Sequence, residues 1–487
     1  MNNGSWLAFI LLVLSIVGIL VQVLALGLIP RNRKPSTGLA WLMLVMLSPW
    51  IGLVAFAFFG RTSVGSKRRH QQADANREIA ARTTDLPDMP VGLAGPEYLA
   101  TSVHLNRALG SMPMTGGNSI EYLPQYETQI ARMADAVRGA QEHVLVEFYI
   151  SAWDDATDPV LTAMAEAAER GVEVKFLFDH LGARGIPGYK DFLKRLNSTR
   201  IEWHEMLPLH PLKATWRRPD LRNHRKLLVV DGRVGFMGSL NLVEPGYDKP
   251  KNHKLGRHWV DLMVCVEGPM VKALEVVFAV DWEKESGYLR DVGPADRHLA
   301  RGLDGVCAQL LPSGPGYPTE NNLRLFNTLI YGAQRRLSLT SPYFVPDESL
   351  LTAVTTAAQR GVEVELFVSE ASDQFMVGHA QASYYRALLE AGIKIWLYPA
   401  PAILHSKHFT IDDHVAVIGS SNMDLRSFAL NYEIIVMLVG GDAIADLRAI
   451  EDANRAVCRP LAMEEWSQRS AGAKYVDTVM RLTSALQ

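Results

Sequence analysis

The hydrophobic and polar positions of the chain set its N-terminal end apart from the rest. Residues Trp6–Ile29 contain no charge and are mostly Leu, Val and Ile, long enough for a helix to cross the roughly 30 Å hydrocarbon layer of a membrane. A second uncharged stretch, Leu39–Phe59, follows the basic turn Arg31–Pro35. A signal peptide is the alternative, but the apolar part is too long, lacks a basic start and is followed by a second span. We therefore expect residues 1–61 to be a two-span membrane anchor, although Pro49 leaves a re-entrant hairpin open.

Beyond the anchor, the chain shows the same alternation of helix and strand patterns twice. Residues 62–118 are polar, and we expect them to be a linker that leads into the globular part. Residues Leu161–Phe178 and Leu351–Val368 are identical at ten of eighteen positions. Each copy begins with apolar residues at helical spacing, has a Gly at the end of the predicted helix and continues into a run of β-branched residues, which predicts a strand. Apolar strands precede the two copies, at Val144–Ile150 and Arg336–Thr340.

This duplication predicts the fold class and the domain boundaries. Alternating strands and helices are typical of an α/β protein, and two copies are too few for a solenoid. We therefore expect two α-β-α domains related by a pseudo-twofold axis, over residues 119–300 and 301–487, preceded by a two-helix transmembrane hairpin.

Composition and charge exclude several classes of protein. The 487 residues are 48% hydrophobic and 21% charged, which excludes a disordered or low-complexity chain. The 49 Lys and Arg nearly balance the 52 Asp and Glu, and a net charge of -3 leaves no global basic field that would attract nucleic acid. The cysteines are far apart and lack metal-ligand spacing, so we expect free thiols in a reducing compartment. They are Cys265, Cys307 and Cys458.

Basic residues around the apolar stretches indicate the sidedness of the large domain. Four of them follow the second stretch, against three in the turn between the stretches, and the larger number favours the cytoplasm for the globular part. The cysteine usage agrees with this placement. The four are Arg61, Lys67, Arg68 and Arg69, and the three are Arg31, Arg33 and Lys34.

One short motif occurs in both repeats and brings in the chemistry. The motif is H-x-K-x-x-x-x-D, and its residues are His224, Lys226 and Asp231 in the first copy and His405, Lys407 and Asp412 in the second. A G-S-x-N tail follows, with seventeen residues from His to Asn in both copies. Its polar residues are Ser239 and Asn241 in the first copy and Ser420 and Asn422 in the second. The double occurrence within a duplicated frame argues against coincidence.

Strand geometry predicts that the polar groups of each copy share one face. Residues two apart on a strand point to the same side, so His224 and Lys226 project together. If Asp231 and Gly232 form a two-residue hairpin turn, Ser239 lies opposite His224. Each copy then presents an imidazole, an ammonium, a hydroxyl and an amide, which together form an anion site with a nucleophile.

The same count sets Ser420 opposite His405 in the second copy. Asp231 and Asp412 fall an odd number of residues from their histidines, and we expect them to hold the turn or the neighbouring backbone.

Two such patches brought together would surround one phosphodiester. Lys226 and Lys407 can stabilise the charge of the transition state without a metal ion or another cofactor. One neutral histidine can attack phosphorus while the other, protonated, gives its proton to the leaving oxygen, and the roles then reverse. Asp261 and Glu433 could fix the orientation of the rings by accepting a hydrogen bond from the second ring nitrogen.

The paired motifs resemble those of the phospholipase D superfamily over roughly residues 119–487. With the apolar spans, the basic turn and Ala40-Trp41, the chain resembles the bacterial cardiolipin synthases of this superfamily. The resemblance implies transfer through a phosphohistidine, which joins two phosphatidylglycerols into cardiolipin and releases glycerol at the bacterial inner membrane. The first-motif histidine is often the nucleophile in this family, which implies that role for His224 and acid/base work for His405. The inverted assignment stays open.

Some residues have two interpretations. Arg217 and Arg218 precede the first motif, where a solvated loop and a site that guides the lipid phosphate are both reasonable. Tyr343 and Phe344 could line an acyl-chain entrance, but core positions are the more common interpretation.

Other functions would use the same residues. A phospholipase D-type hydrolase or another phosphatidyltransferase differs only in the attacking group, whereas the net charge argues against a membrane-bound nuclease. The expected partners are phosphatidylglycerol and cardiolipin in the bilayer and no nucleic acid, and a homo-oligomer is open.

Overall fold

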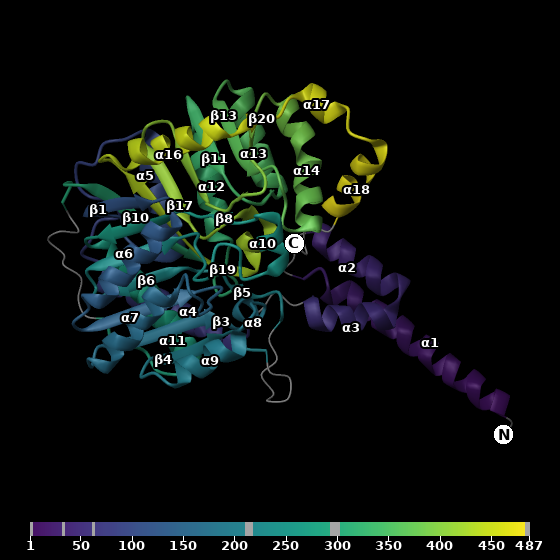
Figure 1. The fold of residues 1–487 in the computed structure, drawn as a ribbon. Coiled ribbons are helices and arrows are strands. Elements are labelled where there is room, and N and C mark those ends of the chain that lie inside the picture. The colour runs from purple at the N-terminus through teal and green to yellow at the C-terminus, as the bar shows by residue number, and fades with distance from the viewer. Residues whose placement is uncertain (1–2, 32–34, 61–63, 210–217, 293–301, 483–487) are drawn as a thin grey trace. The chain divides into compact units, whose positions relative to one another are not determined.

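The computed structural model describes residues 3–31, 35–60, 64–209, 218–292 and 302–482 (Figure 1). The chain divides into two compact units, residues 1–63 and 64–487.

The N-terminal unit consists of three apolar helices. Among the described residues, helix α1 (Asn3–Leu28) is the one helix that is long and apolar enough to cross a membrane. The second expected span is divided into α2 (Pro35–Leu47) and α3 (Pro49–Phe59). Ser48 leaves the helical conformation, with φ of −146°, because the ring of Pro49 disfavours a helical residue before it. The expected two-helix hairpin is therefore seen only in part.

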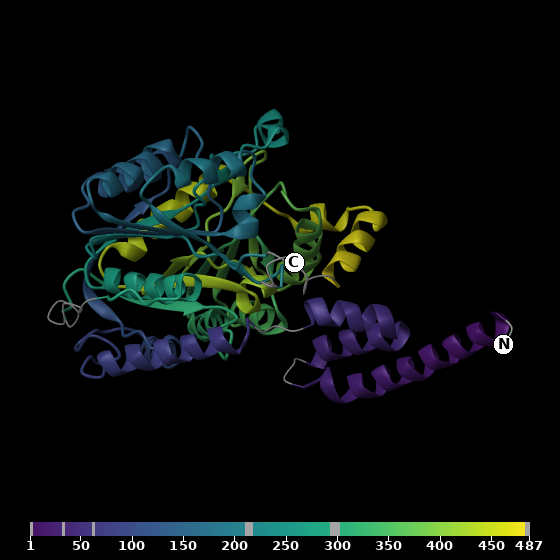
Figure 2. The ribbon, with the colours of Figure 1, turned by 90° about the horizontal axis from the view of Figure 1, so that it is seen from below.

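The three N-terminal helices pack against one another, as Figure 2 shows. Ala25, Ile29 and Val45 form their small core, and the side-chain amide of Gln22 donates to the carbonyl of Met46 at 3.0 Å. This hydrogen bond joins α1 to α2 within an otherwise apolar surface.

The globular unit is built on one 16-stranded sheet whose order is palindromic. Fifteen of its strands form the path β20-β14-β13-β11-β16-β17-β19-β10-β1-β9-β7-β6-β2-β3-β4, in which the edge strand β20 alone has no counterpart, and the sixteenth strand, β5, pairs with β19 off this path. The first repeat contributes β1 (Thr115–Leu123), β2 (His143–Phe148), β3 (Glu173–Asp179), β4 (Glu202–Met206), β6 (Leu227–Val230), β7 (Val234–Gly238) and β9 (Met263–Glu267). The second contributes β10 (Val306–Ser313), β11 (Arg336–Thr340), β13 (Glu363–Ser369), β14 (Lys394–Tyr398), β16 (His408–Ile411), β17 (Val415–Gly419), β19 (Asn431–Val439) and β20 (Arg459–Pro460).

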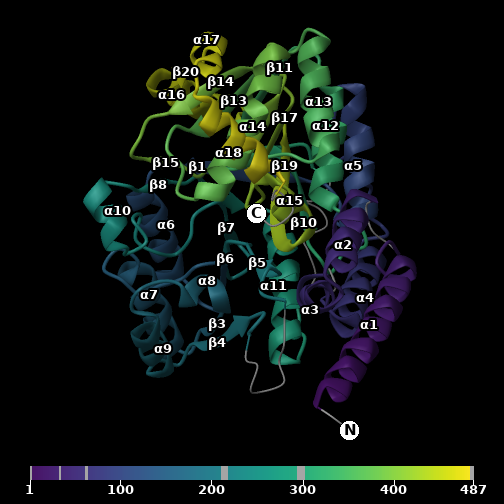
Figure 3. The same ribbon diagram turned by 90° about the vertical axis from the view of Figure 1, so that its right-hand side faces the viewer.

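The two repeats meet at the antiparallel pair β1–β10, and equivalent strands then follow on both sides. Figure 3 shows β11, β13 and β14 of the second repeat in the upper part of the view and β3, β4 and β6 of the first repeat in the lower part. This order is the one that a twofold axis through the sheet would produce, and the expectation of two phospholipase D-like α/β repeats is confirmed. Short strands lie at the repeat boundary and near the motifs. They are β5 (Arg222–Asn223), β8 (Trp259–Val260), β12 (Phe344–Val345), β15 (Ile403–Leu404) and β18 (Met423–Asp424).

Helices cover both faces of the sheet, and the alternation along each strand decides which core a residue joins. On β2, Val144 and Val146 belong to the core beneath α6 and α7, whereas Leu145 belongs to the core beneath α11. The first repeat contains α6 (Tyr126–Arg138), α7 (Asp158–Glu169), α8 (His180–Arg184), α9 (Tyr189–Asn197), α10 (Pro250–Leu255) and α11 (Met270–Ser286). The second contains α12 (Asn321–Gly332), α13 (Glu348–Gln359), α14 (Phe375–Glu390), α15 (Leu425–Ala429), α16 (Ala443–Val457), α17 (Met463–Ser467) and α18 (Ala471–Arg481).

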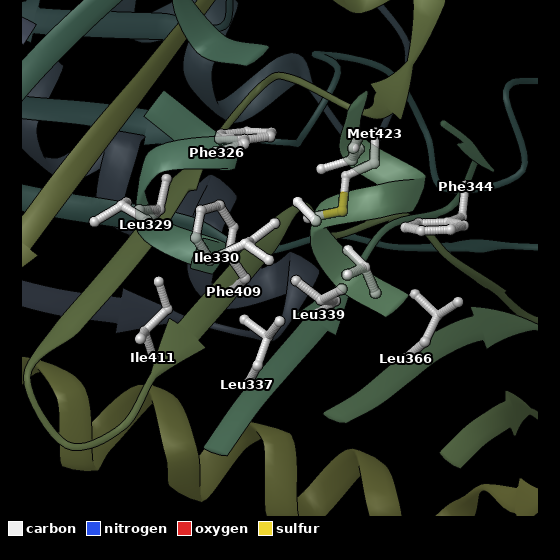
Figure 4. Packing of buried hydrophobic residues seen from close by; sticks show 14 of the residues in the cluster. Phe326, Leu329, Ile330, Leu337, Leu339, Phe344, Leu366, Phe409, Ile411 and Met423 are labelled. Atoms are coloured by element: carbon white, nitrogen blue, oxygen red, sulfur yellow. The ribbon is translucent and has the colours of Figure 1, made fainter. Parts of the chain in front are cut away.

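The core of the second repeat shows how the duplicated pattern packs (Figure 4). Leu339 on β11 pairs with Phe409 on β16 across an antiparallel ladder. The ring of Phe409 meets Phe326 of α12 edge-on, with 4.9 Å between the ring centroids. Burial of each such side chain stabilises the fold by on the order of 2 kcal/mol.

Residues 62–118, which we expected to be a linker, contain two helices that belong to the globular unit. Helix α4 (Ser66–Arg82) lies against α11, and α5 (Glu97–Gly110) lies against α12. The guanidinium of Arg68 donates to both oxygens of Glu285 at 2.8 Å, and Arg68 is only 4% exposed.

The aspartate of each motif binds the backbone at the start of a neighbouring strand. The carboxylate of Asp231 accepts three hydrogen bonds, of 2.8 to 2.9 Å, from the backbone N–H groups of Gln141, Glu142 and His143. The carboxylate of Asp412 is bound in the same way by residues 334–336. Both aspartates thus fix a hairpin to the adjacent strand, β2 or β11.

Asp231→Asn should lower the free energy of unfolding at pH 7 by about 1–2 kcal/mol, because the variant loses the charge on the acceptor of three hydrogen bonds. Burial raises the pKa of Asp231, but the three N–H donors outweigh it and leave the pKa below its usual value. A carboxyl group with a depressed pKa stabilises the fold above its unfolded pKa of about 3.9, and this contribution is lost as the pH falls through the folded value.

Denaturant unfolding of the two proteins at pH 7 and at about pH 3 measures this difference. The gap between wild type and variant should shrink at the lower pH, and an equal gap at both would contradict the account. Asp135→Asn, at an exposed position on α6, is the matched control and should change stability little.

Candidate active site

Two short parallel strand pairs deliver each motif histidine to the other repeat. Strand β5 pairs with the first residues of β19, and the backbone N–H of His224 donates to the carbonyl of Tyr432 at 2.8 Å. Strand β15 pairs with β8, and the N–H of His405 donates to the carbonyl of Val260 at 2.8 Å. The two connections are equivalent, and each crosses from one repeat to the other.

As a result, each histidine binds the carboxylate of the opposite repeat. Nδ1 of His224 lies 3.0 Å from a carboxylate oxygen of Glu433 and 3.0 Å from the carbonyl of Ser420. Nδ1 of His405 lies 2.6 Å from the carboxylate of Asp261. Within the described part of the chain, Nε2 of neither ring has a hydrogen bond, so Nε2 is the atom available for chemistry.

The two serines bind these carboxylates rather than the histidine of their own repeat. The hydroxyl of Ser239 donates to Asp261 at 2.6 Å, and the hydroxyl of Ser420 donates to Glu433. Ser239 therefore belongs with His405. The predicted pairing of each serine with the histidine of its own motif is wrong.

The reason is a register shift of one residue. Val230 pairs with Val234 and Ile411 with Val415, so each hairpin loop contains three residues instead of the expected two. The backbone N–H of Asp231 donates to the carbonyl of His143 at 2.9 Å, which holds this residue to β2. A shift of one residue in a strand changes every facing pair.

The two lysines are buried beside the histidines. Nζ of Lys226 donates to the carbonyl of His224 at 2.6 Å, and Nζ of Lys407 donates to the carbonyl of His405. Burial, against the attraction of Glu433 and with the help of the charge of Lys407, lowers the pKa of Lys226 to about 7. Burial likewise lowers the pKa of Lys407 to about 8.

The electrostatic environment joins the two halves into one site. Burial lowers the pKa of His224 well below its usual value, and the charges of Lys226, Lys407 and His405 add to the effect. These charges come from both repeats and act on the same ring, so the two motifs lie within electrostatic range of each other. The prediction that the repeats bring their imidazole and ammonium groups together is consistent with this arrangement.

The two carboxylates differ in acidity. Burial opposes the ionisation of Asp261, but His405, Lys407 and the hydroxyl of Ser239 outweigh it and lower the pKa of Asp261 to about 2. Burial dominates at Glu433 and raises its pKa to about 7. At neutral pH, His405 therefore has a fully ionised neighbour, whereas His224 has one that is close to half protonated.

The asparagines of the G-S-x-N tails have different surroundings. The side-chain amide of Asn241 donates to the hydroxyl of Tyr247 at 2.7 Å, and its oxygen accepts from the N–H of Ile150 at 3.3 Å. The side-chain oxygen of Asn422 is buried and has no hydrogen-bond partner among the described residues. Only the second asparagine therefore offers a free acceptor.

The described residues give no support for a phosphate-guiding role of the two predicted arginines. Arg217 lies outside the described residues. Nε of Arg218 donates to the carboxylate of Asp220 at 2.6 Å, so its charge is already paired.

Sequence analysis missed a buried ion pair behind the first motif. Arg225, the variable residue of that motif, is 1% exposed; it binds the carboxylate of Asp281, and its Nε donates to the carbonyl of Glu433 at 3.1 Å. Arg225 thus fixes the backbone of Glu433, whose carboxylate binds His224. The signal available in the sequence was Asp281, a charge within the apolar run of α11.

One group of possible metal ligands occurs in the described part of the chain, and it does not include the motif residues. Ligand atoms of Glu244, Asp248 and His253 lie within 4.8 Å of one another. His253 is exposed, and its Nε2 lies 3.0 Å from Glu244, as in an ordinary surface ion pair.

Comparisons with known proteins agree with this geometry. The family model described as "Cardiolipin synthase, PLD-like domain" matches residues 133–282 and 326–452. The model described as "Phospholipase D-nuclease N-terminal" matches residues 20–61.

Curated relatives match over nearly the whole chain. Cardiolipin synthase A of Proteus mirabilis is 30% identical over 470 residues, which cover 96% of this chain and 95% of the relative. Cardiolipin synthase A of Yersinia pestis is 31% identical with the same coverage. The crystal structure of phosphatidylserine synthase from Haemophilus influenzae has a TM-score of 0.59 at 14% identity and covers 80% of this chain and 100% of its own. This structure supports the fold alone, but the sequence matches extend to both motifs and both repeats, and the chain therefore belongs to the cardiolipin synthase family of the phospholipase D superfamily.

Proposed function

We propose that this protein is a phosphatidyltransferase that joins two phosphatidylglycerol molecules into cardiolipin and releases glycerol. The observation that carries the proposal is the crossed arrangement, in which His224 with Glu433 and His405 with Asp261 face a common space with two buried lysines. The names of the relatives, cardiolipin synthase A, support the same activity. One anionic phosphodiester matches the two ammonium groups.

The reaction has two displacements at phosphorus. Nε2 of His224 attacks, the bond between phosphorus and the glycerol oxygen breaks, and His405 gives its proton to that oxygen. A hydroxyl of the second phosphatidylglycerol then gives its proton to His405 and attacks phosphorus, and the bond to His224 breaks. Lys226 and Lys407 stabilise the charge on the equatorial oxygens in both steps, while Ser239 and Ser420 hold the carboxylates that orient the rings.

The unequal carboxylates support this division of roles. A nucleophilic imidazole must be neutral, and burial together with three neighbouring charges lowers the pKa of His224 well below normal. Burial also lowers the pKa of His405, but the ionised Asp261 opposes that effect and favours the protonated ring. His405 is therefore the better proton donor for the first step.

The apolar N-terminal unit supports a membrane location. We propose that residues 1–61 anchor the protein in the bacterial inner membrane and that the globular unit lies on the cytoplasmic side. The lipid substrates are then at high local concentration. The helix break at Pro49 is compatible with a second span or with a hairpin that returns to the same side.

Product analysis tests the function. The purified full-length protein, supplied with phosphatidylglycerol in micelles, should give cardiolipin and glycerol in equal amounts by mass spectrometry. His224→Ala and His405→Ala should each lower kcat about a hundred- to ten-thousandfold, because the groups act as a unit. Phosphatidic acid as the main product would favour a hydrolase, and full activity in either variant would refute the shared site.

Trapping the intermediate tests the assignment of roles. Rapid denaturation of the enzyme during turnover at neutral to mildly alkaline pH, where the acid-labile N–P bond survives, followed by peptide mapping without acid, should find phosphorus on His224. His405→Gln should slow both the formation and the breakdown of this adduct, because each needs a proton transfer. Phosphorus found on His405 would invert the two roles.

The pH dependence follows from the lysines. In the free enzyme, Lys226 and Lys407 lose their charge between about pH 7 and pH 8, so kcat/KM should fall as the pH rises through this window. Lys407→Arg keeps its charge at high pH, and its residual kcat/KM should decline less steeply between pH 7 and pH 9. A wild-type profile that stays flat to pH 9 would contradict this origin of the alkaline limb.

A further inference from the structure

A half-buried carboxylate, Asp373, lies in a loop that contacts the strand leading to the second histidine, and it has no part in the mechanism above. It belongs to the loop between β13 and α14. The hydroxyl of Ser369, at the end of β13, accepts the backbone N–H of Leu404 at 2.8 Å, one residue before His405. A side-chain nitrogen of Arg257 donates to the carbonyl of Ser372 at 3.3 Å. These two contacts hold the loop next to the strand pair that delivers His405.

The carboxylate of Asp373 is held by one phenol. The hydroxyl of Tyr343 lies 2.9 and 3.0 Å from its two oxygens. A carboxylate accepts about four hydrogen bonds, and within the described ranges Asp373 has no other side-chain hydrogen bond or ion pair. Its charge also acts on Lys407 and Tyr247, which places it within electrostatic range of the reacting groups. Asp373 therefore retains acceptor capacity near the site.

Tyr247 completes a polar rim on this side. Tyr247 is buried, and its hydroxyl accepts a hydrogen bond from the side-chain amide of Asn241. Its ring packs on Trp259 with 4.5 Å between the ring centroids. Burial raises the pKa of Tyr247, and the charge of Asp261, the partner of His405, raises it further. A phenol and a carboxylate thus lie within electrostatic range of Asp261 and Lys407, the groups that accompany His405.

The first repeat has different groups at the equivalent place. The bridge between Ser151 and Leu242 is the counterpart of the pair between Phe344 and Met423, so Ile150 occupies the position of Tyr343. The phenol on that side is Tyr149, whose ring lies 5.1 Å from the ring of His224, and the carboxylate is Asp179, which is already bound by Arg222 and by the backbone N–H of Asn223. A carboxylate with spare acceptor capacity therefore lies on the His405 side.

The direction of displacement determines what faces the rim. Attacking and leaving groups lie roughly in line across phosphorus, so with His224 on one side the alcohol oxygen lies on the other, beside His405. The leaving glycerol and the incoming glycerol group of the acceptor both occupy that place. A carboxylate there repels phosphate but binds vicinal hydroxyls, each of which can donate to it.

We propose that Asp373, oriented by Tyr343 and accompanied by Tyr247, binds the glycerol hydroxyls of phosphatidylglycerol and selects a polyol as the acceptor. This inference rests on the proposed transferase function and deepens it. A site built to bind hydroxyls discriminates against an alcohol that lacks them, because its polar groups are then left unpaired.

Competition between two alcohols tests the proposal. Full-length protein in phosphatidylglycerol micelles receives equal concentrations of isotopically labelled glycerol and 1-propanol, which has the same carbon chain and one hydroxyl. Mass spectrometry measures labelled phosphatidylglycerol against phosphatidylpropanol. Wild type should favour glycerol, and Asp373→Ala and the nearly isosteric Asp373→Asn should each lower the product ratio about tenfold, the value of a hydrogen bond to a charged group.

Tyr343→Phe should lower the ratio by a smaller factor, because it releases the carboxylate without removing it. Glu390→Gln, which removes an exposed carboxylate on α14, is the matched control and should leave the ratio unchanged. An unchanged ratio in both Asp373 variants would overturn the polyol site while leaving the transferase function intact. A wild-type protein that makes neither cardiolipin nor either alcohol product would overturn the proposed function itself.

Discussion

The site depends on two hydrogen-bonded strand pairs that cross between the repeats. The backbone of His224 is bound to Tyr432, and that of His405 is bound to Val260. Each pair ends one residue before the carboxylate that its histidine needs, so neither repeat contains a complete site by itself. The antiparallel contact of β1 with β10 makes both crossings possible at once, because it joins the repeats into one sheet.

Burying several charged groups together is unfavourable in free energy, and the lowered pKa values of Lys226 and Lys407 are a result of it. Taking two ammonium groups from water into protein is unfavourable unless partners compensate them, and Asp261 and Glu433 must also serve the histidines. An arriving phosphodiester supplies the missing negative charge, so substrate binding should restore protons to Lys226 and Lys407. The buried ammonium groups of the site thus favour an anionic ligand.

Local patterns in the sequence predicted the repeats, the α/β class, the motif residues and the backbone role of Asp231, because each depends on spacing within a few residues. The crossed partners could not be found in this way, since Glu433 reaches His224 only through the docking of two domains. The hairpin register failed by one residue because Asp231 is held by β2. The buried pair of Arg225 with Asp281 was missed because the two residues lie far apart in the sequence.

The symmetry of the frame and the asymmetry of its side chains have different consequences. A palindromic sheet places two equivalent histidines at the same junction between the repeats, and the proposed two-step transfer uses one ring as nucleophile and leaving group and the other for the proton. Equivalent surroundings would leave these roles interchangeable. Replacement of one acid by another, Asp261 opposite Glu433, gives the rings different neighbours, and Tyr343 stands where the first repeat has Ile150. Duplication supplied the two rings, and divergence at a few positions beside them is sufficient to assign their roles.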